Sequence, residues 1–154
     1  MRGESVKTLI IRSPNSQKEY ETMYDLRWRI LREPWNQPPG SEKDEMEDQS
    51  YHFIIVLDNK IVATARLHKN SESEGQIRYL AVEEEYRKQG IASKLLYYIE
   101  GFAIKLGLSS LILNARQTAQ PLFERIGYKV LREGHLLFGE IPHFVMWKKI
   151  VYNS

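Results

Sequence analysis

Cysteine is absent from the 154 residues of this sequence. Its absence excludes a disulfide framework, a zinc site built on thiolates and a cysteine nucleophile, and it fits a reducing compartment. The sequence also lacks the roughly 18 consecutive apolar residues of a membrane-spanning helix. Met1 to Ser5 does not have the character of a signal peptide. We therefore expect a cytoplasmic protein with no membrane partner.

The sequence also lacks a large excess of charge of either sign. The chain carries 22 Lys and Arg against 20 Asp and Glu, a formal net charge of +2, and it has no basic block. This balance gives no reason to expect a nucleic-acid partner. The dispersed histidines lack the spacing of metal ligands, so no metal is expected. With 42% hydrophobic and 27% charged residues, the sequence is typical of one ordinary domain that spans residues 1–154.

Alternating and helical apolar patterns predict an α/β (α+β) fold with the order β-α-β-β-β-α-β-α-β-β. Ser16 and Glu19 have the spacing of a capping box at the first helix, and Gly107 is well placed to end the second. Eight strand-like segments are present, one more than this order counts: residues 6–11, 51–57, 61–68, 76–82, 108–113, 128–131, 136–138 and 144–150. The helical segments are residues 16–31, 91–106 and 117–126.

Residues 33–50 interrupt this order. The segment has no apolar period, carries Pro34, Pro38 and Pro39, and then turns acidic. We expect a long loop with a little helix at most. A loop of this length inside a compact domain is often functional, and its carboxylates would then attract a cationic substrate. The alternative is a solvated acidic surface.

The stretch from Ala81 to Ser93 runs from an apolar strand through an acidic turn into a helix that starts near Gly90. If the backbone comes close at Gly90, free N–H groups and the positive end of the helix dipole converge there, with Arg87 and Lys88 beside them. This predicts a phosphate site. The alternative is a plain strand-turn-helix connection with solvated basic residues. A nucleotide-binding module is disfavoured, because the P-loop spacing is not matched.

Four short stretches carry a family resemblance. Arg87 to Ala92 has the spacing Arg-x-x-Gly-x-Ala, and Leu122 to Tyr128 contains an aromatic-x-x-x-Gly-aromatic ending. Asn114 to Arg116 and Ile141 to Met146 are the other two. With the element order, they resemble the GCN5-related N-acetyltransferase (GNAT) superfamily over nearly the whole chain. Together with Leu26-Arg27 and the proline-rich loop, they look like the small bacterial subgroup typified by ElaA and YjcF.

The resemblance implies a mixed central sheet of about six or seven strands flanked by about four helices, and transfer of an acetyl group from acetyl-CoA directly to a primary amine. In this fold the strand before the motif splays from its neighbour, so its backbone binds the pantetheine. The N–H of Val82 is then the expected oxyanion donor. The expected contacts to coenzyme A are Leu80, Ala81, Val82, Arg87, Lys88, Gln89, Gly90, Ile91, Ala92, Ser93, Asn114, Ala119 and Phe123.

The acid and the base are less well marked. Phe123 stands where many relatives carry a tyrosine as general acid. A slower enzyme is expected, because general acid assistance is typically worth about 10²–10⁴-fold. Tyr128 is a candidate substitute acid. His143 is a candidate base, because an imidazole has a suitable pKa range. A histidine that ties down its turn by a backbone hydrogen bond is an equal alternative.

The expected acceptor is a small-molecule or peptide amine, and the chain is expected to act as a monomer or homodimer. Glu33, Trp35 and Arg78 are candidates to bind the acceptor. For Arg78, exposure or pairing with Glu83 to Glu85 is at least as reasonable, and an aromatic such as Trp35 is often a packing residue. A non-catalytic acyl-CoA binder or sensor of the same fold is the alternative function, favoured by Phe123.

Overall fold

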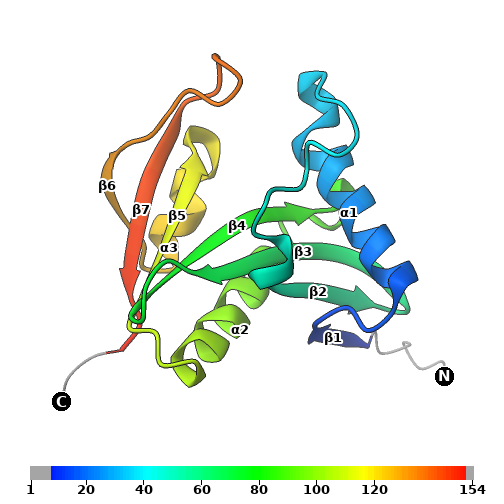
Figure 1. Cartoon of the computed structure of the whole chain (residues 1–154), viewed down its shortest axis with the longest axis horizontal. Helices are drawn as coiled ribbons and strands as arrows, with labels where there is room; N and C mark the ends of the chain where they lie inside the picture. The colour runs from blue at the N-terminus through cyan, green and yellow to red at the C-terminus, as the bar shows by residue number, and fades with distance from the viewer. Residues whose placement is uncertain (1–7, 152–154) are drawn as a thin grey trace, which may run out of the picture.

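The computed structural model describes residues 8–151. Their strands form one seven-stranded sheet in the order β1-β2-β3-β4-β5-β7-β6 (Figure 1). β4 and β5 are parallel, and the other neighbouring strands are antiparallel. The strands are β1 (Leu9–Arg12), β2 (Tyr51–Leu57), β3 (Lys60–Lys69), β4 (Glu74–Val82), β5 (Ser110–Arg116), β6 (Lys129–Glu133) and β7 (His143–Lys149).

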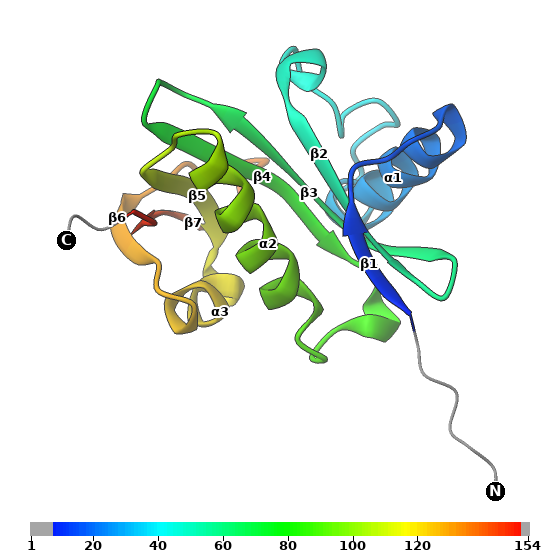
Figure 2. The same ribbon diagram turned by 90° about the horizontal axis from the view of Figure 1, so that it is seen from below.

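Helices cover both faces of this sheet. α1 (Gln17–Leu31) lies on one face against β3 and β4, whereas α2 (Ile91–Lys105) and α3 (Gln120–Arg125) lie on the other (Figures 1 and 2). The expected mixed sheet with flanking helices is thus confirmed. Single 3-10 turns lie at Glu33–Trp35, Glu47–Gln49, Glu84–Tyr86 and Gln117–Ala119.

Two details of the expected fold are wrong. Residues 8–151 contain three α-helices rather than about four, because the remaining helical segments are single 3-10 turns. The strand expected at residues 136–138 does not form: Leu137 makes only an isolated bridge to Ile141, because Phe138 (φ 55°) and Gly139 (φ 75°) reverse the chain at once. The first strand begins at Leu9, and the part of its prediction before residue 8 lies outside the described residues.

The helix starts follow from local sequence. Ser16 caps α1, and its Oγ accepts the N–H of Glu19 at 3.1 Å. The Glu19 carboxylate accepts the N–H of Asn15 and the guanidinium of Arg12 instead of returning to Ser16, so the capping box is only half formed. Pro121 lies in the first turn of α3, where its missing N–H costs nothing.

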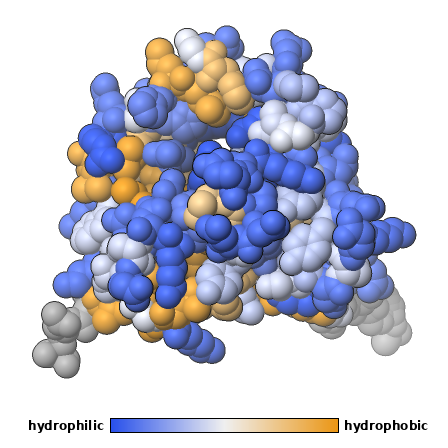
Figure 3. Space-filling view, in the orientation of Figure 1, coloured by the Kyte–Doolittle hydropathy of each residue, from blue (hydrophilic) through white to orange (hydrophobic). Residues whose placement is uncertain are grey.

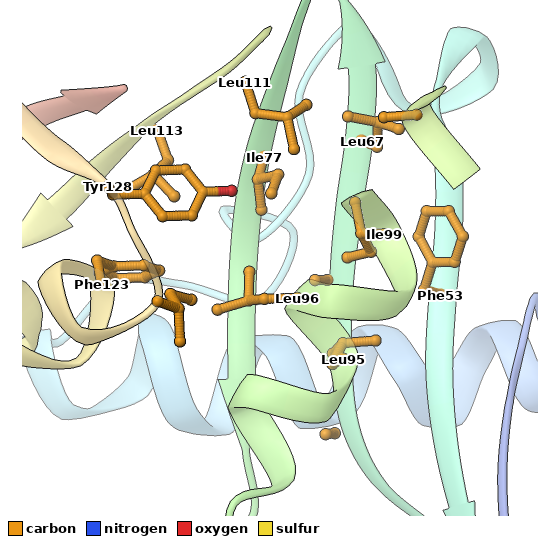
Figure 4. Close-up of a cluster of buried hydrophobic side chains, with 14 of the residues drawn as sticks. Phe53, Leu67, Ile77, Leu95, Leu96, Ile99, Leu111, Leu113, Phe123 and Tyr128 are labelled. Atoms are coloured by element: carbon orange, nitrogen blue, oxygen red, sulfur yellow. The ribbon is translucent and has the colours of Figure 1, made fainter. Parts of the chain in front are cut away.

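The core lies between α2 and the sheet (Figure 4). Leu95, Leu96 and Ile99 form one helical stripe that is fully buried against sheet residues such as Phe53 and Leu67. Their spacing of three and four residues places them on one side of the helix. This packing fixes the start of α2 relative to the end of β4.

β4 and β5 pair over only part of their length. Their parallel register runs from Glu74 opposite Ser110 to Ile77 opposite Leu113 and ends there. Beyond this point β4 remains paired with β3 and β5 remains paired with β7, so the sheet opens into a V. A bulge in β4 marks the opening: Tyr79 has a left-handed φ of 59°, and two residues of β4 lie opposite one residue of β3. The splay expected of the strand before the motif is therefore present.

Candidate active site

A cleft of about 1240 Å³ opens between the separated ends of β4 and β5. Its walls come from the end of β4, the start of α2, the end of β5, α3 and the C-terminal end of α1. Trp35 after α1, and Leu137 and His143 near the β6–β7 connection, also line it. This volume exceeds the roughly 300–1,000 Å³ of ordinary small-molecule pockets, so the cleft has room for a long ligand.

The end of β4 turns backbone N–H groups towards this cleft. The N–H of Glu83 donates to the carbonyl of Val62 on β3 at 2.8 Å. N–H groups along an extended strand alternate between its two edges. Those of Val82 and Leu80 therefore point away from β3, to the side that β5 has left. The Val82 carbonyl lies on the same edge and accepts a hydrogen bond from Nε of Arg87 at 3.2 Å.

α2 begins at the same end of β4. Its N-cap residue, Gly90, has a left-handed φ of 79°, and Lys88 is also left-handed at 62°. The first intrahelical bond joins the N–H of Lys94 to the carbonyl of Gly90, so the N–H groups of Ile91 to Ser93 have no acceptor in the helix. A Cβ added at Gly90 would meet nothing within 4 Å. Free N–H groups, the helix dipole and open space together make an anion-binding cradle.

Most of the residues expected to contact coenzyme A line this one cleft. Gln89 does not; its side-chain amide donates to the carbonyl of Glu85 at 3.1 Å. Ala81 lines the cleft, but by the same strand alternation its backbone groups face Thr64 on β3. The others that line it are Leu80, Val82, Arg87, Lys88, Gly90, Ile91, Ala92, Ser93, Asn114, Ala119 and Phe123.

Phe123 and Tyr128 pack edge to face, with ring centroids 5.9 Å apart. Phe123 lines the cleft, where it brings no hydroxyl group. Tyr128 is 2% exposed, is not among the lining residues, and its hydroxyl has no hydrogen-bond partner in the described part of the chain. In Figure 4 this hydroxyl points into the core, towards Ile77. Burial raises the pKa of Tyr128. The structure thus places the predicted substitute acid in the core and not in the cleft.

His143 begins β7 opposite Arg116 of β5, and it lines the cleft. Its Nδ1 lies 3.0 Å from the carbonyl oxygen of Ile141. Because a carbonyl only accepts, Nδ1 carries the proton, and Nε2 of the neutral ring keeps a free lone pair. Burial lowers the pKa of His143, which favours this neutral form. The side chain of His143 can therefore anchor the turn through Nδ1 and also offer Nε2 as a basic nitrogen.

The three predicted acceptor residues are placed differently. Glu33 is exposed and is not a lining residue, whereas Trp35 and Arg78 line the cleft. Nη1 of Arg78 lies 2.8 Å from Oδ2 of Asp44. The predicted alternative partner Glu83 is bound instead by Arg29 at 2.9 Å.

The 33–50 loop is long and has only short 3-10 turns, as expected, and two of its carboxylates, Asp44 and Glu47, bind arginines of the fold instead of being plainly solvated. Asp44 and Glu47 bind Arg66, which is 0% exposed, at 2.6 and 2.8 Å. Glu47 also binds Arg27 at 3.0 Å. Although burial opposes it, the hydrogen bond from Arg66 contributes to a pKa of about 2 for Asp44. We call Arg27, Arg66, Arg78, Asp44 and Glu47 the Arg66 cluster.

Two lining arginines, Arg32 and Arg116, had no role in the sequence predictions. Arg32 follows the last residue of α1, and Arg116 is the last residue of β5. The available signal was weak, because an arginine at the end of an element is usually a solvated residue. Their position in the cleft follows only from the tertiary fold.

Metal and membrane features are absent from the described residues. Within residues 8–151, no group of three or more His, Asp or Glu side chains could hold a metal ion. In the same span, no helix is both long enough and apolar enough to cross a membrane.

The fold has close structural counterparts. An aminoglycoside 6'-N-acetyltransferase crystallised with coenzyme A shares the fold, with a TM-score of 0.79 at 18% identity over 94% of this chain and 99% of that one. Residues 20–128 match the Acetyltransferase (GNAT) family, and the chain belongs to this family.

Relatives in Bacillus subtilis (strain 168) are similar over most of their length. The uncharacterized N-acetyltransferase YjcF is 28% identical over 133 residues, which cover 86% of this chain and 94% of that protein. The uncharacterized N-acetyltransferase YitI is 26% identical over 136 residues, 84% of this chain and 91% of that protein. The family expected from the motifs, including the likeness to YjcF, is confirmed.

Proposed function

We propose that this protein transfers the acetyl group of acetyl-CoA directly to a primary amine. The observation that carries the proposal is the junction of β4 and α2, where cleft-facing backbone groups of a splayed strand continue into free N–H groups at a helix start. Such a junction suits a ligand with an amide-containing arm that ends in phosphates. Membership of the acetyltransferase family supports the proposal, as does the coenzyme A bound to the similar aminoglycoside enzyme.

The pyrophosphate of coenzyme A would lie at the start of α2. The N–H groups from Gln89 to Ser93 would donate to it, and Arg87 and Lys88 would supply positive charge. Gly90 leaves room for the phosphate, because no Cβ occupies the open space beside its backbone. On the opposite wall, Asn114 would bond the pantetheine arm, and Ala119 and Phe123 would flank the thioester end.

The proposed oxyanion donor is the N–H of Val82. The N–H of Leu80 lies on the same edge of β4, about 6–7 Å nearer the closed end of the V, and serves the arm or the thioester as a second donor. Both groups belong to the backbone and are held by the sheet, so they need no reorganisation as negative charge develops.

In the proposed reaction the amine nitrogen attacks the thioester carbon, the carbonyl oxygen takes the negative charge, and the C–S bond then breaks. The amine loses a proton, for which Nε2 of His143 is the proposed acceptor. The departing thiolate gains one. Phe123 has none to give, but a thiol pKa of about 8.5 makes the thiolate a tolerable leaving group, so water can supply this proton.

A non-catalytic acyl-CoA binder is the second candidate function, and the phenyl ring of Phe123 in the cleft wall favours it. The two candidates differ in whether acetyl-CoA is consumed. Release of free thiol from acetyl-CoA, measured with a panel of amines, rises above the amine-free rate for an enzyme and does not rise for a binder.

Gly90→Glu tests the placement of coenzyme A. A carboxylate at the helix start opposes the phosphates, and we expect coenzyme A affinity to fall by about 100-fold, or roughly 2.7 kcal/mol, in calorimetry. Gly90→Ala adds the strain of a left-handed φ without the charge, so it separates the two effects. Gly101→Glu is the matched control, because Gly101 lies on the same helix and a Cβ there also meets nothing within 4 Å. Unchanged affinity in a folded Gly90→Glu protein would refute the placement.

A further inference from the structure

Two arginines of the cleft, Arg32 and Arg116, differ from the arginines of the Arg66 cluster in having no carboxylate partner. Arg27, Arg66 and Arg78 each bind Asp44 or Glu47. Arg32 and Arg116 form no ion pair with any residue in the range 8–151, although both line the cleft. A buried cation is costly unless it is paired. Arg32 is buried and Arg116 is half-buried, so the missing partner of Arg32 above all points to a ligand.

Arg32 is held firmly in place. It is 8% exposed, its Nε donates to the carbonyl of Ser41 at 3.0 Å, and its Nη1 donates to the carbonyl of Leu31 at 3.1 Å. Its guanidinium carbon lies 5.4 Å from the ring centroids of both Tyr79 and Phe138. Nη2 donates to none of the described residues. Two carbonyls and two rings thus orient a positive charge that has no carboxylate partner among the described residues and whose Nη2 is unused.

Arg116 adds further donors from the end of β5, and its guanidinium lies over the ring of Trp35. The guanidinium carbon of Arg116 lies 5.7 Å from the ring centroid of Trp35. Nε1 of Trp35 is buried and has no hydrogen-bond partner in the described part of the chain. Burial, and then the charge of Arg32, lower the pKa of Arg116. An anion bound in the cleft that both arginines line would offset these like charges.

We infer that the acceptor amine carries an acidic group, a carboxylate or a phosphate, which Arg32 and Arg116 bind. The inference rests on the proposed function, since it names the class of acceptor for the same cleft. Guanidinium groups match both anions with paired N–H donors. Acidic amines of this kind include free amino acids, peptides that present a carboxylate near the amine, and aminoalkyl phosphates.

The same charges disfavour a polycationic acceptor. Two unpaired arginines repel further ammonium groups, so an aminoglycoside or a polyamine is a poor fit. The two arginines also favour the neutral form of a bound amine, and the neutral amine is the form that attacks the thioester. Figure 3 shows that apolar side chains gather over the β6–β7 connection, where Leu136 is 59% exposed.

Acetamido acids that resemble the reaction product give a direct test. Calorimetry with the protein saturated in coenzyme A would compare two mixtures of ligands. The first contains N-acetylamino acids, and the second contains the same compounds with the carboxylate replaced by an amide. N-acetylaminoethyl phosphate is the third ligand in this comparison, and spermidine is the fourth. We expect an acid, either carboxylate or phosphate, to bind at least tenfold more tightly than the amides. We expect Arg116→Met to remove this difference while coenzyme A affinity stays unchanged.

Arg132→Met is the control, because Arg132 is exposed on β6 and does not line the cleft. Equal binding of acids and amides, no binding of either acid, or tighter binding of spermidine would overturn the inference. A tenfold loss of coenzyme A affinity in Arg116→Met with acid binding intact would also overturn it, since Arg116 would then serve the coenzyme. Thiol release from acetyl-CoA with any amine would still support the proposed function in each of these cases, so the two failures are distinguishable.

Discussion

Polar groups on the two sides of β4 differ in whether they have partners within the fold. On the side of β3 and the 33–50 loop, Arg66 is fully buried and is bound by Asp44 and Glu47. On the side that β5 has left, the N–H groups of Leu80 and Val82, the start of α2, and the side chains of Arg32 and Arg116 have no such partners among residues 8–151. The arginines on one side of this strand have carboxylate partners within the fold, although Nε of Arg27 and Nε of Arg66 donate to no described residue. Arg32 and Arg116 on the other side have no carboxylate partner among residues 8–151.

This difference separates charged groups that are paired within the fold from charged groups that are free to bind a ligand. Buried polar groups in folded proteins are almost always hydrogen-bonded, so a concentration of free donors in one cleft needs a reason. A charge that already has its partners stabilises the fold and gains nothing from a ligand. The Arg66 cluster is therefore expected to affect stability, and the cleft groups outside that cluster are expected to affect binding and rate.

The largest expected effect is on the paired edge. Arg66→Met leaves the carboxylates of Asp44 and Glu47 partly buried without their main cation, and we expect a loss of about 3–5 kcal/mol in the free energy of unfolding. Urea unfolding monitored by circular dichroism measures it. Arg116→Met is the matched substitution on the open edge, and there the loss should stay below about 1 kcal/mol. Equal losses in the two variants would show that the division between the edges is wrong.

A smaller effect, on rate, is expected at His143. An Asn side chain can replace the Nδ1–H donor to Ile141 while removing the basic nitrogen, so His143→Asn separates anchoring from base catalysis. We expect kcat to fall by about 10²-fold or more, within the range of general base catalysis. Burial lowers the pKa of His143, and the base works only when neutral. In the unsubstituted protein, kcat should therefore decline at pH values below 6.5, as the pH falls through the lowered pKa of His143.

The variant should lack this acidic limb of the pH profile. His135→Asn is the control, because His135 is another histidine that lines the cleft. A His143→Asn protein with full kcat and an unchanged profile would leave His143 with the anchoring role alone.

What the sequence could predict depends on how local each feature is. The path from β4 through Gly90 into α2 is continuous in the chain, so strand pattern, glycine and helix start predicted it together. The Arg66 cluster was not predicted, because its partners are about twenty residues apart in the chain and meet only after the loop folds over the sheet. The same holds for Arg32 and Arg116, whose common cleft depends on the separation of β4 and β5.

Tyr128 tests whether a missing partner always marks a functional group, and its expected effect is the smallest. Its hydroxyl is buried without a partner, like the donors of the cleft, but the ring lies in the core against Phe123. A buried unsatisfied hydroxyl costs about 1–3 kcal/mol, so we expect Tyr128→Phe to raise the free energy of unfolding by about 1 kcal/mol and to leave kcat unchanged. Thermal unfolding and thiol release measure the two. A fall in kcat of about 10²-fold or more would instead make Tyr128 the general acid, and unpaired groups outside the cleft would then belong to the site as well.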